Sequence, residues 1–333
     1  MIKDFMQPTN PKQLGRVGVL MGGYSSEREI SLKSGAGIVK ALQEAGCDVL
    51  ALDIAAKNDG LIRTQIRGAK IDVAFNILHG ALGEDGRIQT ILEDLKIPYV
   101  GSGPEASRLA INKASTQKVL AANGVKVPFF FLLMPDKTND LKTIIQRLGF
   151  PVVVKPACQG SSIGVSLVRK PEELTPAVEL AFSYDEDILI EEYIFGREMT
   201  VGILHQTALP VIEVVAKSGF FDFNAKYGGT TEYKIPAPIP EDVARLLQET
   251  ALKVHTTLGC RHFSRVDFML DGANRFYVLE INTVPGFTEM SLLPKAARFT
   301  GISFQDLCLF LLKLAYGEKK SKEIIQHSIV AGR

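Results

Sequence analysis

Apolar and polar positions in the first hundred residues follow two alternating patterns. Short apolar runs at RVGVLMGG, CDVLALDI, IDVAFNILHG and IPYVGSG predict strands. Between them, SSEREISLKSGAGIVKALQEAG and IQTILEDLK carry apolar residues at helical spacing. Because strands that alternate with helices are typical of parallel sheets, we expect an open parallel sheet here.

Beyond residue 108 the predicted strands come closer together. VPFFFLL, FPVVVKP, GVSLVRK and DILIEEYI predict strands of a small antiparallel unit, with helices near LKTIIQRLG and ELTPAVELAF. More paired strands follow, with a long loop, the helix EDVARLLQETALKVHTTLG and a hairpin. The expected fold is therefore α/β and α+β. It has an N-terminal domain over 1–108, two α+β units over 109–194 and 195–320, and a frayed tail over 321–333.

Composition narrows the possible partners. The 333 residues hold 38 Lys and Arg against 37 Asp and Glu, so no charge excess favours nucleic acid, and a small-molecule partner is expected. The four cysteines form no CxxC pair, which favours inert thiols in a reducing compartment over disulfides or a zinc site. We also find no signal peptide and no apolar run long enough for a bilayer, and we expect a cytoplasmic protein without membrane contact.

The hairpin SRVDFMLDGANRFYVLEIN places polar groups inside apolar strands. Side chains alternate along a strand, so Glu280 and Asn282 share one face. DGAN is a turn signal, and a loop of four residues between the strands puts Asp267 opposite Glu280. Facing carboxylates repel unless a cation lies between them, and this set of oxygen atoms suits Mg²⁺. The alternative is a surface hairpin in which Arg265 neutralises one acid.

The segment FPVVVKPACQGSSIGVSLV places Lys155 at the end of an apolar strand and before a Gly/Ser loop with Ser161 and Ser162. The order is not that of a P-loop, in which the lysine follows the glycines and a helix comes next. Backbone N–H groups, hydroxyls and a lysine nevertheless suit a loop that covers phosphates. A plain Gly/Ser turn is the alternative reading.

Three further segments carry candidate chemistry, each with a structural alternative. Glu27 follows the first strand, where open α/β sheets bind ligands, but Ser26 and Glu29 also fit a capping box with Glu27 in the first helical turn. His79 ends another strand and could face the same crevice or be structural. ILIEEYIFGREMTV could bracket a nucleotide base or form an exposed acidic hinge, and the loop with Lys226 and Tyr227 has the length of a lid.

Taken together, these segments resemble the D-alanine:D-alanine ligase family of the ATP-grasp superfamily. The resemblance covers nearly the whole chain, and it rests on the order and spacing of GGYSSEREISLKSG, HGALGEDG, YVGSG, NKASTQ, VKPACQGSSIGVS, ILIEEYIFGREMTV, FNAKY, RVDFML and LEINTVPGFTEMSL. It implies a substrate-binding N-terminal domain and two ATP-grasp subdomains, the first with the serine loop and the second with the lid and the metal site. It also implies ATP-dependent ligation of two D-alanine molecules through D-alanyl phosphate, for peptidoglycan precursors, and a homodimer.

The same resemblance implies roles for individual residues. Metal ligands for two Mg²⁺, for which Mn²⁺ could substitute, would be Asp267, Glu280 and Asn282. Residues at ATP would be Lys113, Lys155, Ser162, Glu191, Glu192, Ile194, Glu198 and Lys226. The first D-alanine would meet Glu27, hydrogen-bonded with Ser161 and Tyr227, with His79 nearby. Arg265 and the backbone N–H of Gly286 would stabilise the oxyanion, and Ser291 and Leu292 would receive the carboxylate of the second D-alanine.

Two departures from the family pattern stand out. Val284 and Phe287 replace residues of the usual NTSPGMT segment, and Cys158 and Gln159 stand between the lysine and the glycine of the serine loop. Two rival interpretations stay open at this stage. One is another carboxylate–amine ligase of the same superfamily, and the other is a nucleotide-binding regulatory protein without turnover.

Overall fold

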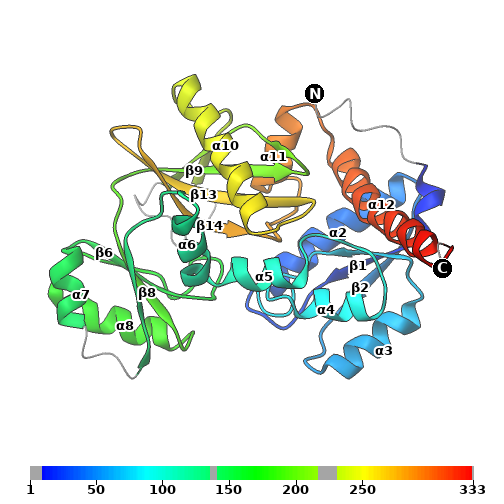
Figure 1. The fold of residues 1–333 in the computed structure, drawn as a ribbon, viewed down its shortest axis with the longest axis horizontal. Helices are drawn as coiled ribbons and strands as arrows, with labels where there is room; N and C mark the ends of the chain where they lie inside the picture. The colour runs from blue at the N-terminus through cyan, green and yellow to red at the C-terminus, as the bar shows by residue number, and fades with distance from the viewer. Residues whose placement is uncertain (1–9, 136–140, 217–230, 332–333) are drawn as a thin grey trace.

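The computed structural model of the chain describes residues 10–135, 141–216 and 231–331. In this part of the chain the strands form three sheets (Figure 1). No single helix among the described residues is long and apolar enough to cross a membrane, although α11 (Leu292–Phe299) and residues 304–317 of α12 (Phe304–Ala331), bent 105° apart, reach that length and composition as a pair.

The first sheet is parallel, as predicted. Its strand order is β2-β1-β3-β4, with β1 (Arg16–Met21), β2 (Asp48–Asp53), β3 (Val73–Asn76) and β4 (Tyr99–Val100). The associated helices are η1 (Pro11–Leu14), α2 (Arg28–Glu44), α3 (Asp59–Ala69), α4 (Arg87–Asp94) and α5 (Pro104–Ile111). Because strand side chains alternate, Phe75 packs with α2 in one core while its neighbour Ala74 packs with α3 and α4 in another.

The second sheet is small and antiparallel. Its order is β5-β8-β6-β7, with β5 (Phe130–Leu133), β6 (Val152–Pro156), β7 (Ser166–Val168) and β8 (Ile188–Glu192). Helices α7 (Leu141–Leu148) and α8 (Leu174–Phe182), with η3 (Pro171–Glu173) before the latter, accompany it. The apolar side chains of this unit form a core of their own.

The third sheet is antiparallel and carries the hairpin. Its order is β12-β11-β9-β13-β14, with β9 (Gly196–Leu204), β11 (Ile212–Ala216), β12 (Thr231–Lys234), β13 (Phe263–Asp271) and β14 (Phe276–Asn282), and β10 (Thr207–Ala208) pairs with β9. Helices α10 (Glu241–Thr257), α5 and α6 (Lys113–Ala122) contribute side chains to its core. The boundaries at residues 108 and 194 stay a prediction.

The hairpin confirms the predicted pairing but corrects the turn. Asp271 pairs with Arg275 through a backbone hydrogen bond of 2.8 Å, so the turn has three residues, and Asn274 adopts the left-handed φ of 59° that such turns need. Three residues alone would leave Asp267 opposite Leu279. A β-bulge between Asp267 and Phe268 restores the register, and Asp267 lies opposite Glu280.

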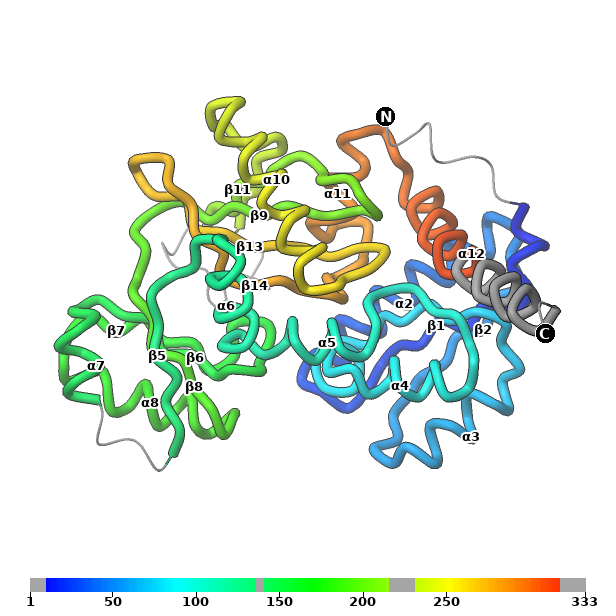
Figure 2. Tube along the Cα trace, viewed as in Figure 1, coloured from blue at the N-terminus to red at the C-terminus, as the bar shows by residue number. Residues whose placement is uncertain are grey.

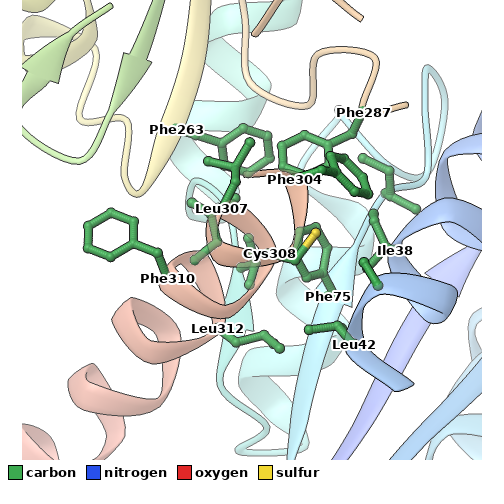
Figure 3. Close-up of a cluster of buried hydrophobic side chains, with 14 of the residues drawn as sticks. Ile38, Leu42, Phe75, Phe263, Phe287, Phe304, Leu307, Cys308, Phe310 and Leu312 are labelled. Carbon is green, nitrogen blue, oxygen red and sulfur yellow. The ribbon is translucent and has the colours of Figure 1, made fainter. Parts of the chain in front are cut away.

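The C-terminal segment closes back on the first sheet. Helix α12 (Phe304–Ala331) contacts α2, β3 and β4, next to α11 (Leu292–Phe299) (Figures 1 and 2). Residues 321–331, for which we expected a frayed end, continue this helix. One core thus unites the first sheet with α12 and part of the third sheet, and its side chains surround Phe287 (Figure 3).

Candidate active site

Two neighbouring cavities contain every predicted site residue that the structure describes. The first, of about 300 Å³, is lined among others by Lys113, Lys155, Ser162, Glu191, Glu192, Ile194, Glu198 and Asp267. The second, of about 240 Å³, is lined among others by Glu27, His79, Ser161, Arg265, Asn282, Gly286, Ser291 and Leu292. Glu280 and Gln159 line both. Lys226 and Tyr227 lie outside the described residues.

Two lysines, both buried, mark the inner end of the first cavity. Lys155 is the penultimate residue of β6 and forms an ion pair of 2.6 Å with Glu191 on β8. Lys113 begins α6, donates to the backbone carbonyl of Gln159 at 2.5 Å and lies 3.3 Å from Glu280 Oε2. Because both ammonium groups line a cavity beside the Gly/Ser loop, the cavity suits an anionic ligand such as a phosphate chain.

The acidic end of β8 and the residues that follow it lie along the same cavity. Glu191 is buried, whereas Glu192 accepts a hydrogen bond of 2.8 Å from the backbone N–H of Phe129. Ile194 and Glu198 line the cavity on either side of the start of β9. The predicted alternative of a purely exposed hinge is therefore wrong for Glu191, because this carboxylate is inside the cavity wall.

The serine loop reaches the N-terminal domain. Ser161 and Ser162 have left-handed φ angles of 52° and 57°, and the Ser161 hydroxyl donates a short hydrogen bond to Glu27 Oε1. A Cβ at Gly160 would lie 3.1 Å from Glu27 Oε2, so a side chain there would crowd this contact. The contact between Glu27 and Ser161 is present as predicted.

Glu27 does not belong to a capping box. Helix α2 begins at Arg28, Glu27 is its N-cap, and the Glu27 side chain makes no capping hydrogen bond. The backbone carbonyl of Glu27 accepts from the N–H groups of Ile30 and Ser31, whereas its carboxylate lines the second cavity. The predicted capping role of Ser26 and Glu29 is therefore wrong, since the chain enters the helix one residue later.

His79 lies beside Glu27 in the lining of the second cavity. It is 3 % exposed, and its Nδ1 lies 2.9 Å from the backbone oxygen of Val284, which can only accept. Nδ1 therefore carries the proton in the neutral ring. Nε2 is buried without a hydrogen-bond partner among the described residues, which leaves it able to accept from a ligand.

The hairpin contributes to both cavities, because Asp267 lines the first, Arg265 lines the second and Glu280 lines both. Arg265 holds Asp267 through Nε at 2.8 Å and Nη2 at 2.7 Å, and the Thr200 hydroxyl donates to Asp267 at 2.6 Å. Burial acts to lower the pKa of Arg265, but the Asp267 carboxylate raises it above its ordinary value, so the group stays charged. The ion pair foreseen in the surface-hairpin alternative is thus present, on a buried hairpin.

The loop after β14 forms the far end of the second cavity. Asn282 accepts a hydrogen bond of 2.8 Å from the backbone N–H of Val284. The Ser291 hydroxyl accepts from the N–H of Thr288 at 3.0 Å, and a Cβ at Gly286 would lie 3.3 Å from it. Ser291 is the N-cap of α11, and Leu292 is its first residue. The free N-terminal N–H groups of a helix at this end favour a carboxylate.

The residues that depart from the family pattern lie in two different regions. Val284 and Phe287 are buried in the core that includes α12, and neither is among the residues that line the two cavities. Gln159 contributes its backbone carbonyl to Lys113, so its side-chain identity does not affect that bond. Burial raises the pKa of the Cys158 thiol to about 11, in agreement with the expected inert cysteine.

Sequence reasoning missed two buried polar groups beside the first cavity. Gln117 on α6 contacts Glu191, and Glu213 on β11 forms an ion pair of 2.7 Å with Arg197. Hydrogen bonding from Arg197 holds the pKa of Glu213 below its usual range. Alternation in PVIEVV could have indicated an inward Glu213, whereas nothing in NKASTQK distinguishes Gln117 from a solvent-facing helix residue.

The chain matches one family of known proteins. The family model described as D-ala D-ala ligase N-terminus matches residues 57–102, and D-ala D-ala ligase C-terminus matches residues 119–313. A curated relative from Geobacter sulfurreducens, named D-alanine--D-alanine ligase, is 46% identical over 294 residues, which cover 88% of this chain and 91% of the relative.

Solved structures give the same match. The D-alanine--D-alanine ligase of Bacillus anthracis complexed with ATP superposes with a TM-score of 0.80 at 31% identity, over 92% of this chain and 99% of that one. The VanG D-Ala:D-Ser ligase of Enterococcus faecalis superposes with a TM-score of 0.78 at 30% identity, over 90% and 99%. The mixed fold predicted from the sequence is thereby confirmed.

Proposed function

This chain belongs to the D-alanine–D-alanine ligase family, and on that premise we propose how its residues carry out the reaction. The protein is a ligase that uses ATP to join two D-alanine molecules into D-alanyl-D-alanine for peptidoglycan synthesis. The observation that supports the residue roles is the meeting of the two cavities at Glu280 and Gln159. ATP in the first cavity would direct its phosphates toward a carboxylate in the second.

In this proposal ATP occupies the first cavity. Lys113 and Lys155 contact its phosphates, with Ser162 and the backbone N–H groups of the serine loop. Glu191, Glu192 and Ile194 frame the adenine, and Glu198 accepts from the ribose hydroxyls. Phosphoryl transfer to a carboxylate brings anions together, so positioning and neutralisation supply most of the catalysis. Lys226 is assigned to the γ-phosphate by sequence alone.

The acids of the hairpin fit a pair of magnesium ions. Asp267 and Glu280 lie directly opposite each other, and Asn282 adds an amide oxygen on the same strand as Glu280. Carboxylate and amide oxygens are the ligands that Mg²⁺ prefers, with phosphates completing its coordination. Among the described residues no group of three or more His, Cys, Asp or Glu is placed to hold a metal ion, and the set proposed here has two carboxylates and one amide. When bound, Mg²⁺ would neutralise the phosphate charge.

The first D-alanine lies in the second cavity. Glu27 receives its ammonium group, and the hydrogen bond from Ser161 orients the Glu27 carboxylate. Nε2 of His79 offers a nearby acceptor. The carboxylate of this D-alanine attacks the γ-phosphorus of ATP, which releases ADP and gives D-alanyl phosphate. Tyr227 would join this group, and the serine loop would exclude water from the acyl phosphate.

The second D-alanine approaches from the α11 end. Its amine attacks the carbonyl carbon of D-alanyl phosphate, and phosphate leaves as the tetrahedral intermediate collapses. Arg265 and the backbone N–H of Gly286 stabilise the oxyanion, while Ser291 and Leu292 receive the second carboxylate. We also propose that the protein works as a cytoplasmic homodimer, in which 1–108, 109–194 and 195–320 are the functional units.

The test measures phosphate release from ATP and Mg²⁺ with D-alanine, L-alanine, or D-alanine plus D-lactate, with product masses determined. Phosphate release is expected in the two reactions that contain D-alanine and not with L-alanine, and the product in both should be the dipeptide rather than the D-lactate ester. Glu280→Gln serves as the comparison, because it keeps the size of the side chain and should strongly shift the Mg²⁺ requirement. Phosphate release that is independent of D-alanine would contradict the proposal.

A further inference from the structure

Gln117 is a buried polar residue for which the proposed reaction has no role. It lies on α6, one turn after Lys113, and its side chain is 0 % exposed. We propose that Gln117 is a positioning residue that fixes the carboxylate of Glu191 and thereby sets the preference of the site for adenine. This proposal rests on the nucleotide site proposed above.

The bonds of Gln117 join three elements around the first cavity. Its Nε2 lies 3.2 Å from Glu191 Oε2 on β8 and 3.3 Å from the backbone oxygen of Leu279 on β14. The other carboxylate oxygen, Oε1, accepts from Lys155 Nζ at 2.6 Å. One oxygen of Glu191 is therefore held by a cation and the other by an amide, so the carboxylate plane is fixed from both sides.

The orientation of the amide follows from its partners. Both atoms near Nε2 are acceptors, so the flipped amide would place a third oxygen against them. In the observed orientation Oε1 is buried without a partner among the described residues. An unsatisfied buried acceptor destabilises a fold, and an apolar residue would avoid that cost. A glutamine at such a position is better explained by the group it holds than by its own packing.

The fixed carboxylate of Glu191 can distinguish adenine from guanine. A carboxylate accepts about four hydrogen bonds, so Glu191 retains capacity beyond Lys155 and Gln117. Glu191 also lines the first cavity. The exocyclic amino group of adenine donates, whereas guanine has a carbonyl oxygen at the same ring position. A fixed carboxylate accepts from the first and repels the second, but a carboxylate free to rotate discriminates less well.

The experiment measures binding of ATP and of GTP to the full chain by calorimetry, without D-alanine. Gln117→Met keeps the side-chain length and removes the amide. The matched control is Gln248→Met, because Gln248 on α10 donates to the backbone oxygen of Leu209 at 3.0 Å and lines neither cavity. Without Gln117 the Glu191 carboxylate is free to turn away from the adenine amino group, and loss of that hydrogen bond to a charged group predicts a roughly tenfold or larger weakening for ATP, with little change for GTP. Gln248→Met should change neither.

A double-mutant cycle separates positioning from general packing. Glu191→Gln should weaken ATP binding by itself, and Gln117→Met should have little further effect in that background. Additive effects, or unchanged ATP affinity in Gln117→Met, would overturn the proposal. So would loss of a cooperative melting transition in both Gln117→Met and Gln117→Leu, since the role would then be structural. If the wild-type chain discriminates ATP from GTP but forms no dipeptide, the residue roles proposed for the reaction are refuted, whereas the proposal for Gln117 is not.

Discussion

The guanidinium group of Arg265 occupies both carboxylate oxygens of Asp267, at 2.8 Å and 2.7 Å, while Glu280 faces Asp267 across the hairpin. Arg265, proposed to stabilise the oxyanion, and Asp267, proposed to bind a metal ion, are therefore bonded to each other in this structure. If this ion pair separates, Asp267 becomes available to a metal ion and Arg265 to the oxyanion at the same time.

Arg265→Met should separate these functions. We expect kcat to fall by about 10²- to 10³-fold, as for loss of an oxyanion donor, while the Mg²⁺ concentration for half-maximal activity does not rise, because Asp267 has lost its competing cation. The control is Arg275→Met, which breaks a pair of 2.7 Å with Asp271 at the exposed tip of the same hairpin. Activity of Arg265→Met close to wild type would reduce Arg265 to a structural partner.

Ser161→Gly and Ser162→Gly form a matched pair at the serine loop. Both residues have left-handed φ angles, 52° and 57°, so glycine relieves the same backbone strain at each. Only Ser161→Gly removes the donor to Glu27, and we expect it to raise the KM for D-alanine with little change in ATP affinity. Steady-state kinetics in both substrates would show this. Equal KM values for D-alanine in the two variants would argue against a role for the hydroxyl.

Phe287→Ala should destabilise the whole protein. The Phe287 ring lies 5.6 Å from the rings of Phe75, Phe263 and Phe304, between the first sheet, β13 and α12 (Figure 3). Removing such a side chain costs about 3–5 kcal/mol in the free energy of unfolding, which urea titration measures. Phe299→Ala, at a side chain that is 56% exposed, should change it by no more than about 0.5 kcal/mol.

The stability of the protein should fall in mild acid because of His255. Burial lowers the pKa of His255 to about 4, with His262 and His205 adding repulsion. The unfolded chain binds a proton near pH 6.5 and the folded chain does not, so this contribution is fully present above pH 6.5 and is lost as the pH falls toward 4. The loss is about 3 kcal/mol. In His255→Gln, the free energy of unfolding measured with urea should depend less on pH between 6.5 and 4. An unchanged dependence would show that other groups cause the loss of stability in acid.

Local patterns foretold much of the fold because they reflect local physics. The alternation that placed Glu280 and Asn282 on one face depends only on strand geometry, and the structure confirms it. The turn length was wrong because Asn274 adopts a left-handed conformation that DGAN permits without requiring. The bulge that compensates depends on tertiary context, which a single hairpin sequence does not contain.

Distant contacts set the limits of prediction at the site. The resemblance suggested the contact between Glu27 and Ser161, which are 134 positions apart, whereas residue patterns alone gave each a local alternative. Gln117 was missed because its hydrogen-bond partners lie on β8 and β14, and the periodicity of α6 does not reveal them. The Arg265–Asp267 pair was foreseen only in the alternative interpretation of the hairpin.

Helix α12 also determines when the protein can finish folding during its synthesis. Ile38, Leu42 and Phe75 belong to a core that α12 completes with Leu307, Cys308 and Leu311. About 200 residues separate the end of β4 from the start of α12, which is roughly 10–40 s of translation. Over that interval the first domain emerges with one apolar face uncovered. The side chains of Ile38, Leu42 and Phe75 therefore reach their native packing only after α12 has left the ribosome.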